Sequence, residues 1–371
     1  MILTILCKVV DNFGDIGVTF RMASHLKKIN PSNTVNLIVD NLEAFKKIYS
    51  QVDVSKKYQI VNGINVYDWN AFDLCYSSFS NNKEKAVLSS DRLGVILECF
   101  QCGRPEWLEK ILFEDELEKT VHIIMIDYLT AEAYAEDFHL LKSLTRRAKV
   151  QKVNFMPGFT DKTGGLIIDD GWKEAVSYNK DGPVLFFTYD KDFSGVVSAL
   201  KKSRFTTILL AQGKGKASFE KAWNENIKNE NHPVKLEVLD YLDLYEWDEM
   251  LKKCSVLFIR GEETLSRACL SGIPFIWHAY PQSDEYQLVK VQALLEKMKN
   301  YFSTADFLCV EKLMLAFNQT KTSDDIEKYT DEFLQRIDGL REGYKNFSID
   351  LRKNGELCSN LMTFIEKITI I

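Results

Sequence analysis

Short apolar runs alternate with amphipathic stretches along the first half of the chain. The first run, residues 2–10, is rich in β-branched side chains, and residues 16–29 then carry apolar side chains at helical spacing. The pattern predicts further strands at 35–39, 73–76, 94–100 and 121–126, and helices at 41–49 and 107–119. Because strands and helices alternate, we expect a parallel α/β domain.

The second half repeats this alternation and then becomes helical. Strands are predicted at 184–188, 206–210, 234–239, 256–259 and 273–277, with helices at 216–227 and 243–253. After Pro281 the pattern predicts helices at 285–297, 310–318, 324–338 and 348–370. A glycine-rich segment, 155–165, separates the two series and is either an interdomain loop or part of a cleft. The expected domains are residues 1–165 and 166–345, followed by a C-terminal helix at 346–371.

Composition narrows the class of protein. A chain of 371 residues is long for a single core and favours two domains. The formal net charge of -6 argues against general nucleic-acid binding, which needs a basic surface. The first apolar run lacks a basic leader and a cleavage site, so it predicts a strand and not a signal peptide, and no run is long enough for a membrane span.

The cysteines point to an intracellular protein without a structural metal. Eight cysteines are scattered through apolar segments. Cys99 and Cys102 form a lone CxxC without a second pair or a nearby histidine, which is a weak signal for zinc. We therefore expect reduced thiols and a cytoplasmic protein.

The turn after the first strand carries two carboxylates. Asp11 and Asp15 stand at a strand end followed by a helix start, where a parallel sheet presents its ligand loops. The glycines of this turn do not have the GxGxxG spacing of a dinucleotide-binding fold. Paired carboxylates suit a cationic substrate and proton transfer. In the alternative interpretation, Asp11 caps the helix and Asp15 is solvated.

A second turn of the same kind lies in the C-terminal half. Arg260 ends a predicted strand, Gly261 forms the turn, and Glu262, Glu263 and Thr264 begin a short helix. An arginine fork beside the free N–H groups of a helix start suits a diphosphate. Alternatively, Arg260 pairs with Glu263 and the glutamates merely favour the positive end of the helix.

Four motifs carry a resemblance to a known family. They are, in order along the chain, residues 11–17, 157–166, 260–263 and 280–282. Together they resemble the EarP family, the bacterial elongation factor P arginine rhamnosyltransferases, and the likeness covers essentially the whole chain. It implies a GT-B fold with two Rossmann-like domains facing across a cleft. It also implies dTDP-β-L-rhamnose as the donor, an arginine of elongation factor P as the acceptor, and transfer with inversion.

The resemblance also implies roles for individual residues. Asp11, Asp15 and Glu262 fall on the family's essential carboxylates. Arg260 falls on a diphosphate contact. Further substrate contacts are implied for Asn12, Phe13, Gly14, Phe187, Tyr189, Tyr241, Trp247, Gly261, Glu263 and Thr264.

Some of these positions depart from the family pattern or have a second interpretation. Glu263 and Thr264 replace a usual aspartate and serine, and Leu244 replaces a glutamine near the thymine. A leucine does not hydrogen-bond a base edge, so thymidine stringency is open. Tyr241 and Trp247 either stack on the donor base or, given their helical spacing, belong to the core.

Arginine is an unusual nucleophile because its guanidinium stays protonated at neutral pH. We expect Asp15 to act as the base, Asp11 to orient the guanidinium, and Glu262 to fix the acceptor or the sugar. The two aspartates of the first turn are four positions apart and the five histidines are dispersed, so metal-independent transfer is expected.

Two alternatives stay open. The chain could be a GT-B transferase with another nucleotide sugar or acceptor, which activity with UDP- or GDP-sugars would reveal. It could instead be a non-catalytic protein that binds a nucleotide sugar or elongation factor P. The paired carboxylates favour an enzyme, because a binding protein needs no base. Neither nucleic acid nor a membrane is an expected partner.

Overall fold

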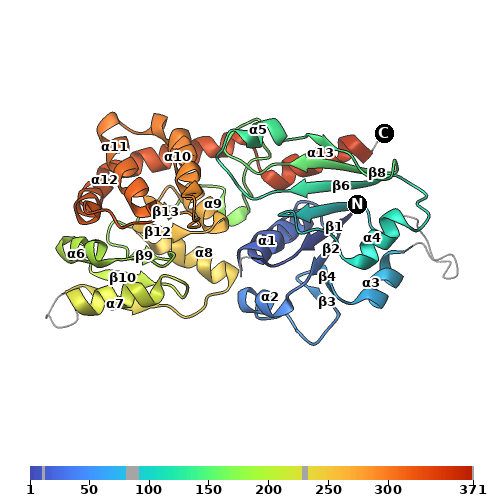
Figure 1. Cartoon of the computed structure of the whole chain (residues 1–371), viewed down its shortest axis with the longest axis horizontal. Helices are drawn as coiled ribbons and strands as arrows, with labels where there is room; N and C mark the ends of the chain where they lie inside the picture. Colours follow the sequence, from blue (N-terminus) through green and yellow to red (C-terminus); the bar gives the residue numbers. More distant parts are fainter. Residues whose placement is uncertain (11–12, 81–91, 228–232, 370–371) are drawn as a thin grey trace. The chain divides into compact units, whose positions relative to one another are not determined.

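The chain folds into two compact units (Figure 1). The computed structural model describes residues 1–10, 13–80, 92–227 and 233–369. The first unit comprises Met1–Leu129, Tyr134–Asp169 and Asn354–Ile371, and the second comprises Thr130–Ala133 and Asp170–Lys353. The chain passes from the first unit to the second after Asp169, close to the expected boundary at 165. The C-terminal residues do not form a third part, because they are divided between the two units.

The first unit is built on an eight-stranded sheet with the order β3-β4-β2-β1-β5-β6-β8-β7. Its strands are β1 (Ile2–Cys7), β2 (Thr34–Val39), β3 (Tyr58–Val61), β4 (Ile64–Asp68), β5 (Val95–Cys99), β6 (Val121–Ile126), β7 (Lys142–Ser143) and β8 (Val150–Phe155). Its helices are α1 (Gly14–Ile29), α2 (Leu42–Ile48), α3 (Phe72–Phe79), α4 (Glu106–Phe113), α5 (Tyr134–Phe138) and α13 (Leu357–Thr369). Pairing is parallel except at the two edges, where β3 and β7 run antiparallel to their neighbours.

The second unit contains a five-stranded, all-parallel sheet with the order β11-β10-β9-β12-β13. The strands are β9 (Val184–Phe186), β10 (Thr207–Leu210), β11 (Lys235–Val238), β12 (Val256–Arg260) and β13 (Phe275–His278). The helices are α6 (Ser194–Lys202), α7 (Lys216–Asn226), α8 (Leu244–Lys253), α9 (Glu262–Ser271), α10 (Tyr286–Met298), α11 (Thr304–Asn318) and α12 (Ile326–Leu351). Short 3₁₀ turns lie at Asp170–Trp172, Lys299–Tyr301 and Arg352–Asn354.

The central strands form because their side chains are apolar on both faces. Every residue of β5 and β13 is buried, as expected for a parallel strand covered on both sides by helices. The stacked rings of Phe186 and Phe258 lie 4.5 Å apart and join the neighbouring strands β9 and β12 in the second core. These strands are the rigid base from which the site loops leave.

One predicted strand is wrong. Residues 73–76 lie within α3, which buries Cys75 and Phe79 one helical turn apart. A short apolar run fits both the strand and the helix period, so periodicity alone did not decide between them.

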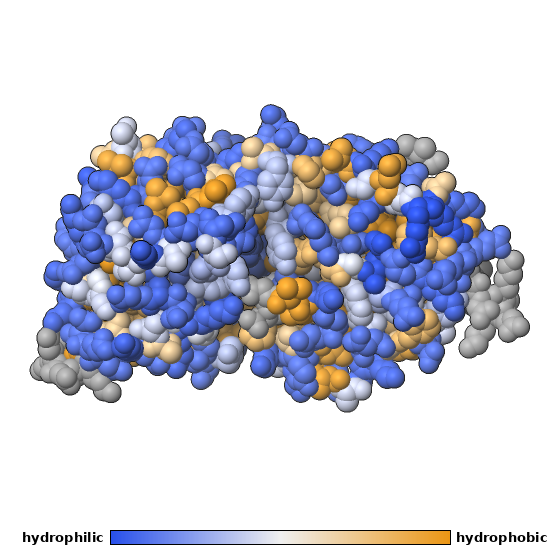
Figure 2. Space-filling model, viewed as in Figure 1, coloured by the Kyte–Doolittle hydropathy of each residue, from blue (hydrophilic) through white to orange (hydrophobic). Residues whose placement is uncertain are grey.

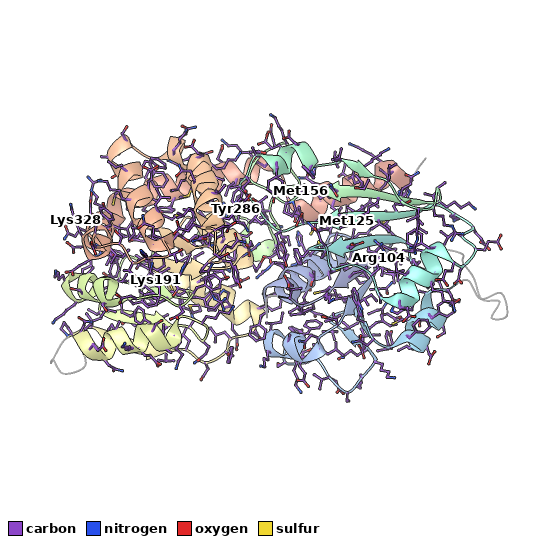
Figure 3. The ribbon with its side chains drawn as sticks, viewed as in Figure 1. Arg104, Met125, Met156, Lys191, Tyr286 and Lys328 are labelled. Atoms are coloured by element: carbon purple, nitrogen blue, oxygen red, sulfur yellow. The ribbon has the colours of Figure 1, made fainter. Side chains whose placement is uncertain are left out.

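The segment Thr130–Ala133 leaves the first sheet and joins the second unit. Its Glu132 is buried, and Glu132 Oε1 accepts a hydrogen bond from the hydroxyl of Tyr286 at 2.5 Å, while Oε2 accepts one from Thr130. Tyr286, labelled in Figure 3, is the first residue of α10. A buried carboxylate with these partners ties the segment to the start of α10.

The C-terminal region contains a break that the sequence pattern did not predict. Instead of one helix over 348–370, α12 ends at Leu351 and α13 begins at Leu357. Gly355 in the break has φ 83°, and a Cβ there would lie 2.9 Å from the side chain of Asn360. This angle favours glycine, because a residue with a side chain is strained there.

The glycine-rich segment after β8 is held within the first unit. Its two arms bond to each other through Gly164 N–H and Met156 O, at 2.7 Å. Asn354 donates to Phe159 O and Asn360 donates to Gly164 O. The residues around the C-terminal break therefore fix the conformation of this motif.

Polar side chains dominate the face shown in Figure 2, where apolar residues form small, separate patches. In the part of the chain that the structure describes, no helix is both long and apolar enough to cross a membrane. The eight cysteines are free, and seven of them are buried.

We predict that Glu356 stabilises the first unit in a pH-dependent manner. Its carboxylate accepts from the N–H groups of Cys358 and Ser359 at the start of α13 and lies 3.4 Å from His25. Burial acts to raise the pKa of Glu356, but these partners outweigh it and hold the pKa below the usual glutamate value. A lowered folded pKa contributes stability above the unfolded pKa, and this stability is lost as the pH falls through the folded value.

Glu356→Gln should therefore lower the free energy of unfolding by about 1–2 kcal/mol at pH 7. The difference from wild type should shrink as the pH falls below about 4. Urea unfolding at both pH values measures it, with Glu366→Gln on the exposed side of α13 as the control. An equal difference at both pH values would contradict a charge-dependent role.

Candidate active site

Asp15 is held at the start of α1, just beyond the carboxyl end of β1. Its side chain is 1% exposed. Oδ2 accepts a hydrogen bond from the N–H of Val10 at 2.7 Å, and Oδ1 accepts one from the hydroxyl of Tyr128 at 3.0 Å. The alternative of a solvated Asp15 is therefore wrong. These two bonds orient the carboxylate of Asp15.

The loops that surround Asp15 come from three neighbouring strands. Tyr128 follows β6, and Phe100 follows β5, which lies between β1 and β6 in the sheet. The rings of Phe100 and Tyr128 stack with centroids 4.5 Å apart and planes 17° apart. This contact fixes the phenol that bonds Asp15. Tyr128 was not predicted from the sequence; its position two residues after a strand end is the signal that could have found it.

The structure describes only some of the other residues that were predicted to act at this turn. Asp11 and Asn12 lie outside the described residues. Phe13 precedes α1 at the N-cap position and makes no side-chain cap bond, and its ring lies 5.7 Å from Lys47 Nζ. Gly14 is exposed and begins the helix. Asp15 is thus the described carboxylate of this turn.

Arg260 contacts two aromatic rings at the carboxyl end of the second sheet. It ends β12, while Phe187 and Tyr189 follow β9, the adjacent strand. The guanidinium carbon lies 4.6 Å from the centroid of each ring. Arg260 Nε is buried without a hydrogen-bond partner among the described residues. The two rings thus hold the fork by cation–π contact.

The turn after Arg260 exposes the N-terminus of α9. Gly261 has φ 77°, an angle that favours glycine, and nothing lies within 4 Å of where its Cβ would be. Glu262 and Glu263 occupy the first helical turn, and Thr264 is buried behind them. A helix start of this kind presents free N–H groups next to the arginine fork.

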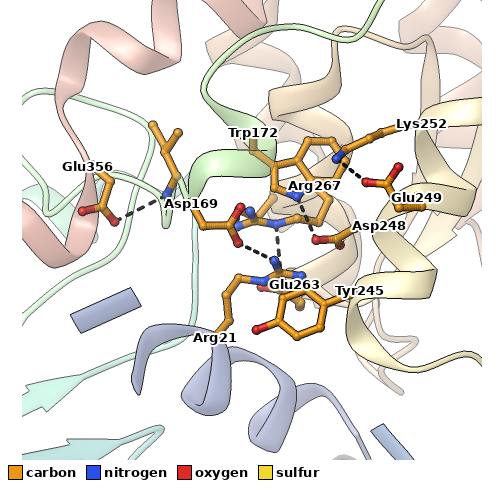
Figure 4. Close-up of polar contacts among 12 residues, drawn as sticks. Arg21, Asp169, Trp172, Tyr245, Asp248, Glu249, Lys252, Glu263, Arg267 and Glu356 are labelled. Atoms are coloured by element: carbon orange, nitrogen blue, oxygen red, sulfur yellow. Dashed lines mark hydrogen bonds and ion pairs between the residues drawn. The ribbon is translucent and has the colours of Figure 1, made fainter. Parts of the chain in front are cut away.

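Glu263 pairs along its own helix. Its carboxylate lies 3.3 Å from Arg267 Nε, one turn further on (Figure 4). Arg267 is fully buried and its guanidinium lies 5.6 Å from the ring of Trp172, whose indole N–H donates to Asp248 at 2.9 Å. The alternative in which Arg260 pairs with Glu263 is thus replaced by a Glu263–Arg267 pair within α9. Arg267 contacts α8 indirectly, through Trp172 and its bond to Asp248.

The three predicted residues around α8 have different environments. Trp247 is half-buried and meets Phe187 edge-on, with ring centroids 4.9 Å apart. Tyr241 is 63% exposed and lies in the loop before α8, so it is not a core residue. Leu244 is buried as the first residue of α8, behind a capping box formed by Asp243 and Glu246.

Several groups at this edge were not predicted as site residues. Lys214 Nζ lies 5.8 Å from the ring of Tyr189 and 5.4 Å from that of Tyr280. Lys191, labelled in Figure 3, donates to the carbonyl of Phe317 at 2.6 Å, and burial lowers its pKa to about 8. Both lysines follow strand ends of the second sheet, and this position is the signal that could have found them.

The edge therefore presents cations, aromatic faces and helix N–H groups together. Such a combination suits an anion attached to a flat ring, as in a nucleoside diphosphate. Among the described residues, no group of three or more His, Cys, Asp and Glu side chains could hold a metal ion. The edge itself offers protein cations and backbone dipoles to such an anion.

A comparison with known families identifies the family of the chain. The family described as Elongation-Factor P (EF-P) rhamnosyltransferase EarP matches residues 3–366. The chain belongs to the EarP family. The resemblance drawn from the four sequence motifs is thereby confirmed.

Its relatives in the EarP family match at modest identity over most of their length. The protein-arginine rhamnosyltransferase of Shewanella oneidensis is 26% identical and aligns over 98% of this chain and 97% of its own. That of Pseudomonas aeruginosa is 28% identical over 79% of this chain and 80% of its own. That of Neisseria meningitidis is 25% identical over 98% and 96%.

Solved structures show the GT-B fold. A structure that explains EarP-mediated arginine glycosylation of translation elongation factor EF-P has a TM-score of 0.59 at 18% identity and covers 99% of both chains. A glycosyltransferase from Siraitia grosvenorii in complex with UDP reaches 0.53, and an α-glucosyltransferase in complex with UDP reaches 0.52, each with 99% coverage of both chains. Their identities of 10% and 9% carry the fold and nothing more. The expected GT-B fold is confirmed.

We predict that Trp247→Ala weakens the binding of a nucleoside diphosphate while the protein stays folded. The substitution removes the ring that supports Phe187, and Phe187 in turn supports Arg260. The expected loss is about 1–3 kcal/mol in binding free energy, as for base–aromatic contacts. Calorimetry with dTDP measures it.

Trp69→Ala is the matched control, because Trp69 is also half-buried but lies in the first unit. It should lower thermal stability without changing dTDP affinity. Equal dTDP affinity in Trp247→Ala and wild type would show that Trp247 only packs.

Proposed function

We propose that this chain transfers L-rhamnose from dTDP-β-L-rhamnose to an arginine side chain of elongation factor P, with inversion of the anomeric centre. The observation that carries the proposal is the EarP family match across residues 3–366. The relatives are named protein-arginine rhamnosyltransferases, which supports both the sugar and the acceptor residue. A cytoplasmic location goes with this acceptor.

The reaction is a single displacement. A guanidinium nitrogen forms a bond to the anomeric carbon while the bond from that carbon to the dTDP oxygen breaks. Attack from the face opposite the leaving group inverts the centre. The nitrogen must lose a proton as it bonds, and the leaving dTDP must have its negative charge stabilised.

Asp15 is the proposed base. It is a buried carboxylate whose orientation is set by Val10 and Tyr128, as a proton acceptor in a displacement requires. Asp11 is proposed to orient the guanidinium from the same turn. Glu262, in the first turn of α9, is proposed to fix the acceptor or the sugar.

The donor is assigned to the edge of the second sheet. Arg260 and the N–H groups at the start of α9 would meet the diphosphate, and Phe187, Tyr189, Tyr241 and Trp247 would surround the nucleoside. Protein cations can stabilise the leaving group, so we propose transfer without a metal. The identity of the nucleobase is the least specified part of the proposed donor. Leu244, which replaces the family's glutamine near the thymine, is buried in the packing of α8.

We predict a gain of one deoxyhexose on one arginine of elongation factor P from the same organism after incubation with the chain and dTDP-rhamnose. Intact-mass analysis with peptide mapping measures the gain. UDP- and GDP-sugars in parallel reactions test the donor. No gain, or a gain on lysine, would overturn the acceptor; transfer from another nucleotide sugar alone would overturn the donor.

We predict opposite defects for Asp15→Asn and Arg260→Ala. An amide does not take the proton, so Asp15→Asn should slow transfer about a hundredfold to ten-thousandfold while dTDP binding is kept. Arg260→Ala should instead lose most of its dTDP affinity. Calorimetry beside a transfer assay separates the two effects.

Asp73→Asn is the control for the first substitution, because Asp73 is also an aspartate in a first helical turn but is exposed. It should behave as wild type. Near-wild-type transfer by Asp15→Asn would move the role of base to Asp11 or Glu262.

A further inference from the structure

His278 lies next to Tyr189, one of the two rings that contact Arg260 in the second unit. It ends β13 and is paired in register with Arg260 on the neighbouring strand β12. Its side chain is 4% exposed. The N–H of Tyr189 donates to His278 Nδ1 at 3.3 Å, and the two rings meet edge-on with centroids 5.4 Å apart. One histidine thus contacts both the backbone and the ring of Tyr189.

The hydrogen bond defines the chemical state of His278. Because Nδ1 accepts, it carries no proton, and the neutral ring carries its proton on Nε2. Burial, together with the nearby charges of Lys191 and Arg260, lowers the pKa of His278 to about 3. The imidazole is therefore neutral at physiological pH and adds no charge next to Arg260.

The backbone on both sides of His278 in the sequence is held by hydrogen bonds. A single buried amide, Asn318, accepts from the N–H of Ala279 at 2.8 Å and donates to the carbonyl of Trp277 at 2.7 Å. The ring of Phe317 packs edge-on against the imidazole with centroids 5.1 Å apart. A side chain fixed by its two neighbours and by a ring has little freedom to move.

The position of Tyr189 matters because its ring is one of the two that contact the guanidinium of Arg260. Arg260 Nε has no hydrogen-bond partner among the described residues, and the guanidinium is held by Phe187 and Tyr189 at 4.6 Å. Arginine carries about 2 kcal/mol of rotamer entropy, so a fork that is already oriented binds an anion at a smaller entropic penalty. The position of Tyr189 therefore decides where the fork points.

We propose that His278 is a positioning residue for donor binding: through its Nδ1 acceptor it sets Tyr189, and through the Tyr189 ring it orients Arg260 toward a nucleoside diphosphate. The proposal rests on the proposed function, since it takes the donor to bind at this edge. It assigns His278 no contact with the donor.

Three substitutions separate the acceptor from the ring. His278→Phe keeps an aromatic ring and removes the acceptor, and His278→Gln moves the acceptor toward the Nε2 position. His278→Asn keeps an acceptor near Nδ1. We expect dTDP affinity to fall about tenfold in the first two, the value of one hydrogen bond, and to stay within about threefold of wild type in His278→Asn. His122→Phe, a half-buried histidine of the first unit, should leave the affinity unchanged.

A double-mutant cycle with Tyr189→Leu tests the route. If His278 acts through Tyr189, His278→Phe should cause little further loss of dTDP affinity once Tyr189 is leucine. Thermal unfolding of each variant shows that the loss is not global, and His278→Gln replaces His278→Phe in the cycle if the phenylalanine variant does not fold. Additive losses, wild-type affinity in both His278→Phe and His278→Gln, or failure of His278→Asn to restore binding would overturn the proposal.

The result is distinct from the test of the proposed function. If wild type binds dTDP but leaves elongation factor P unmodified, the acceptor assignment fails while the His278 comparison is still decided by affinity. If wild type binds UDP or GDP in place of dTDP, the same variants are compared with that nucleotide. If it binds no nucleoside diphosphate, both proposals fall together.

Discussion

Parallel strand pairing is the constraint on which the rest of this structure depends. In each unit the central strands run the same way, so every connection from strand to helix leaves at one edge. That edge collects the side chains which carry chemistry. Asp15 and Tyr128 meet there in the first unit, and Arg260, Phe187 and Tyr189 meet there in the second. Residues far apart in sequence become neighbours because their strands are neighbours.

The same constraint explains how much of the site could be predicted from the sequence. Asp15 lies in the turn after β1 and Arg260 is the last residue of β12. Both strands are largely apolar, so the position of these residues at the carboxyl end of a sheet could be inferred from the pattern alone. The bond from Tyr128 to Asp15 could not, because it depends on the strand order β1-β5-β6, which no local pattern specifies. Glu263 shows the reverse case. Its partner Arg267 stands four residues along one helix, a spacing that the sequence does contain.

The fold was predictable to a similar depth, and its errors have local causes. Most of the buried strands were predicted because both of their faces are apolar. The interior strands β4 and β8, which are only partly buried, and the short edge strands β3 and β7 were not predicted. The short run at 73–76 fits two periods and proved helical. At the C-terminus, a helix that looks continuous is divided near Gly355, which has a positive φ. The apolar periodicity runs on through this break, so the pattern alone does not show it.

The carboxyl ends of the two sheets differ in the charged side chains that they carry. The edge of the first unit holds a buried carboxylate, which suits a guanidinium, and the edge of the second holds Arg260 and Lys214, which suit a diphosphate. A transfer to arginine needs both, because the acceptor is a cation and the leaving group an anion. On the proposed function, Asp15 of one sheet would bind the acceptor and Arg260 of the other would bind the diphosphate, so each charge meets a substrate of opposite sign. His278 next to Arg260 is neutral and adds no charge to the cationic end of the second sheet.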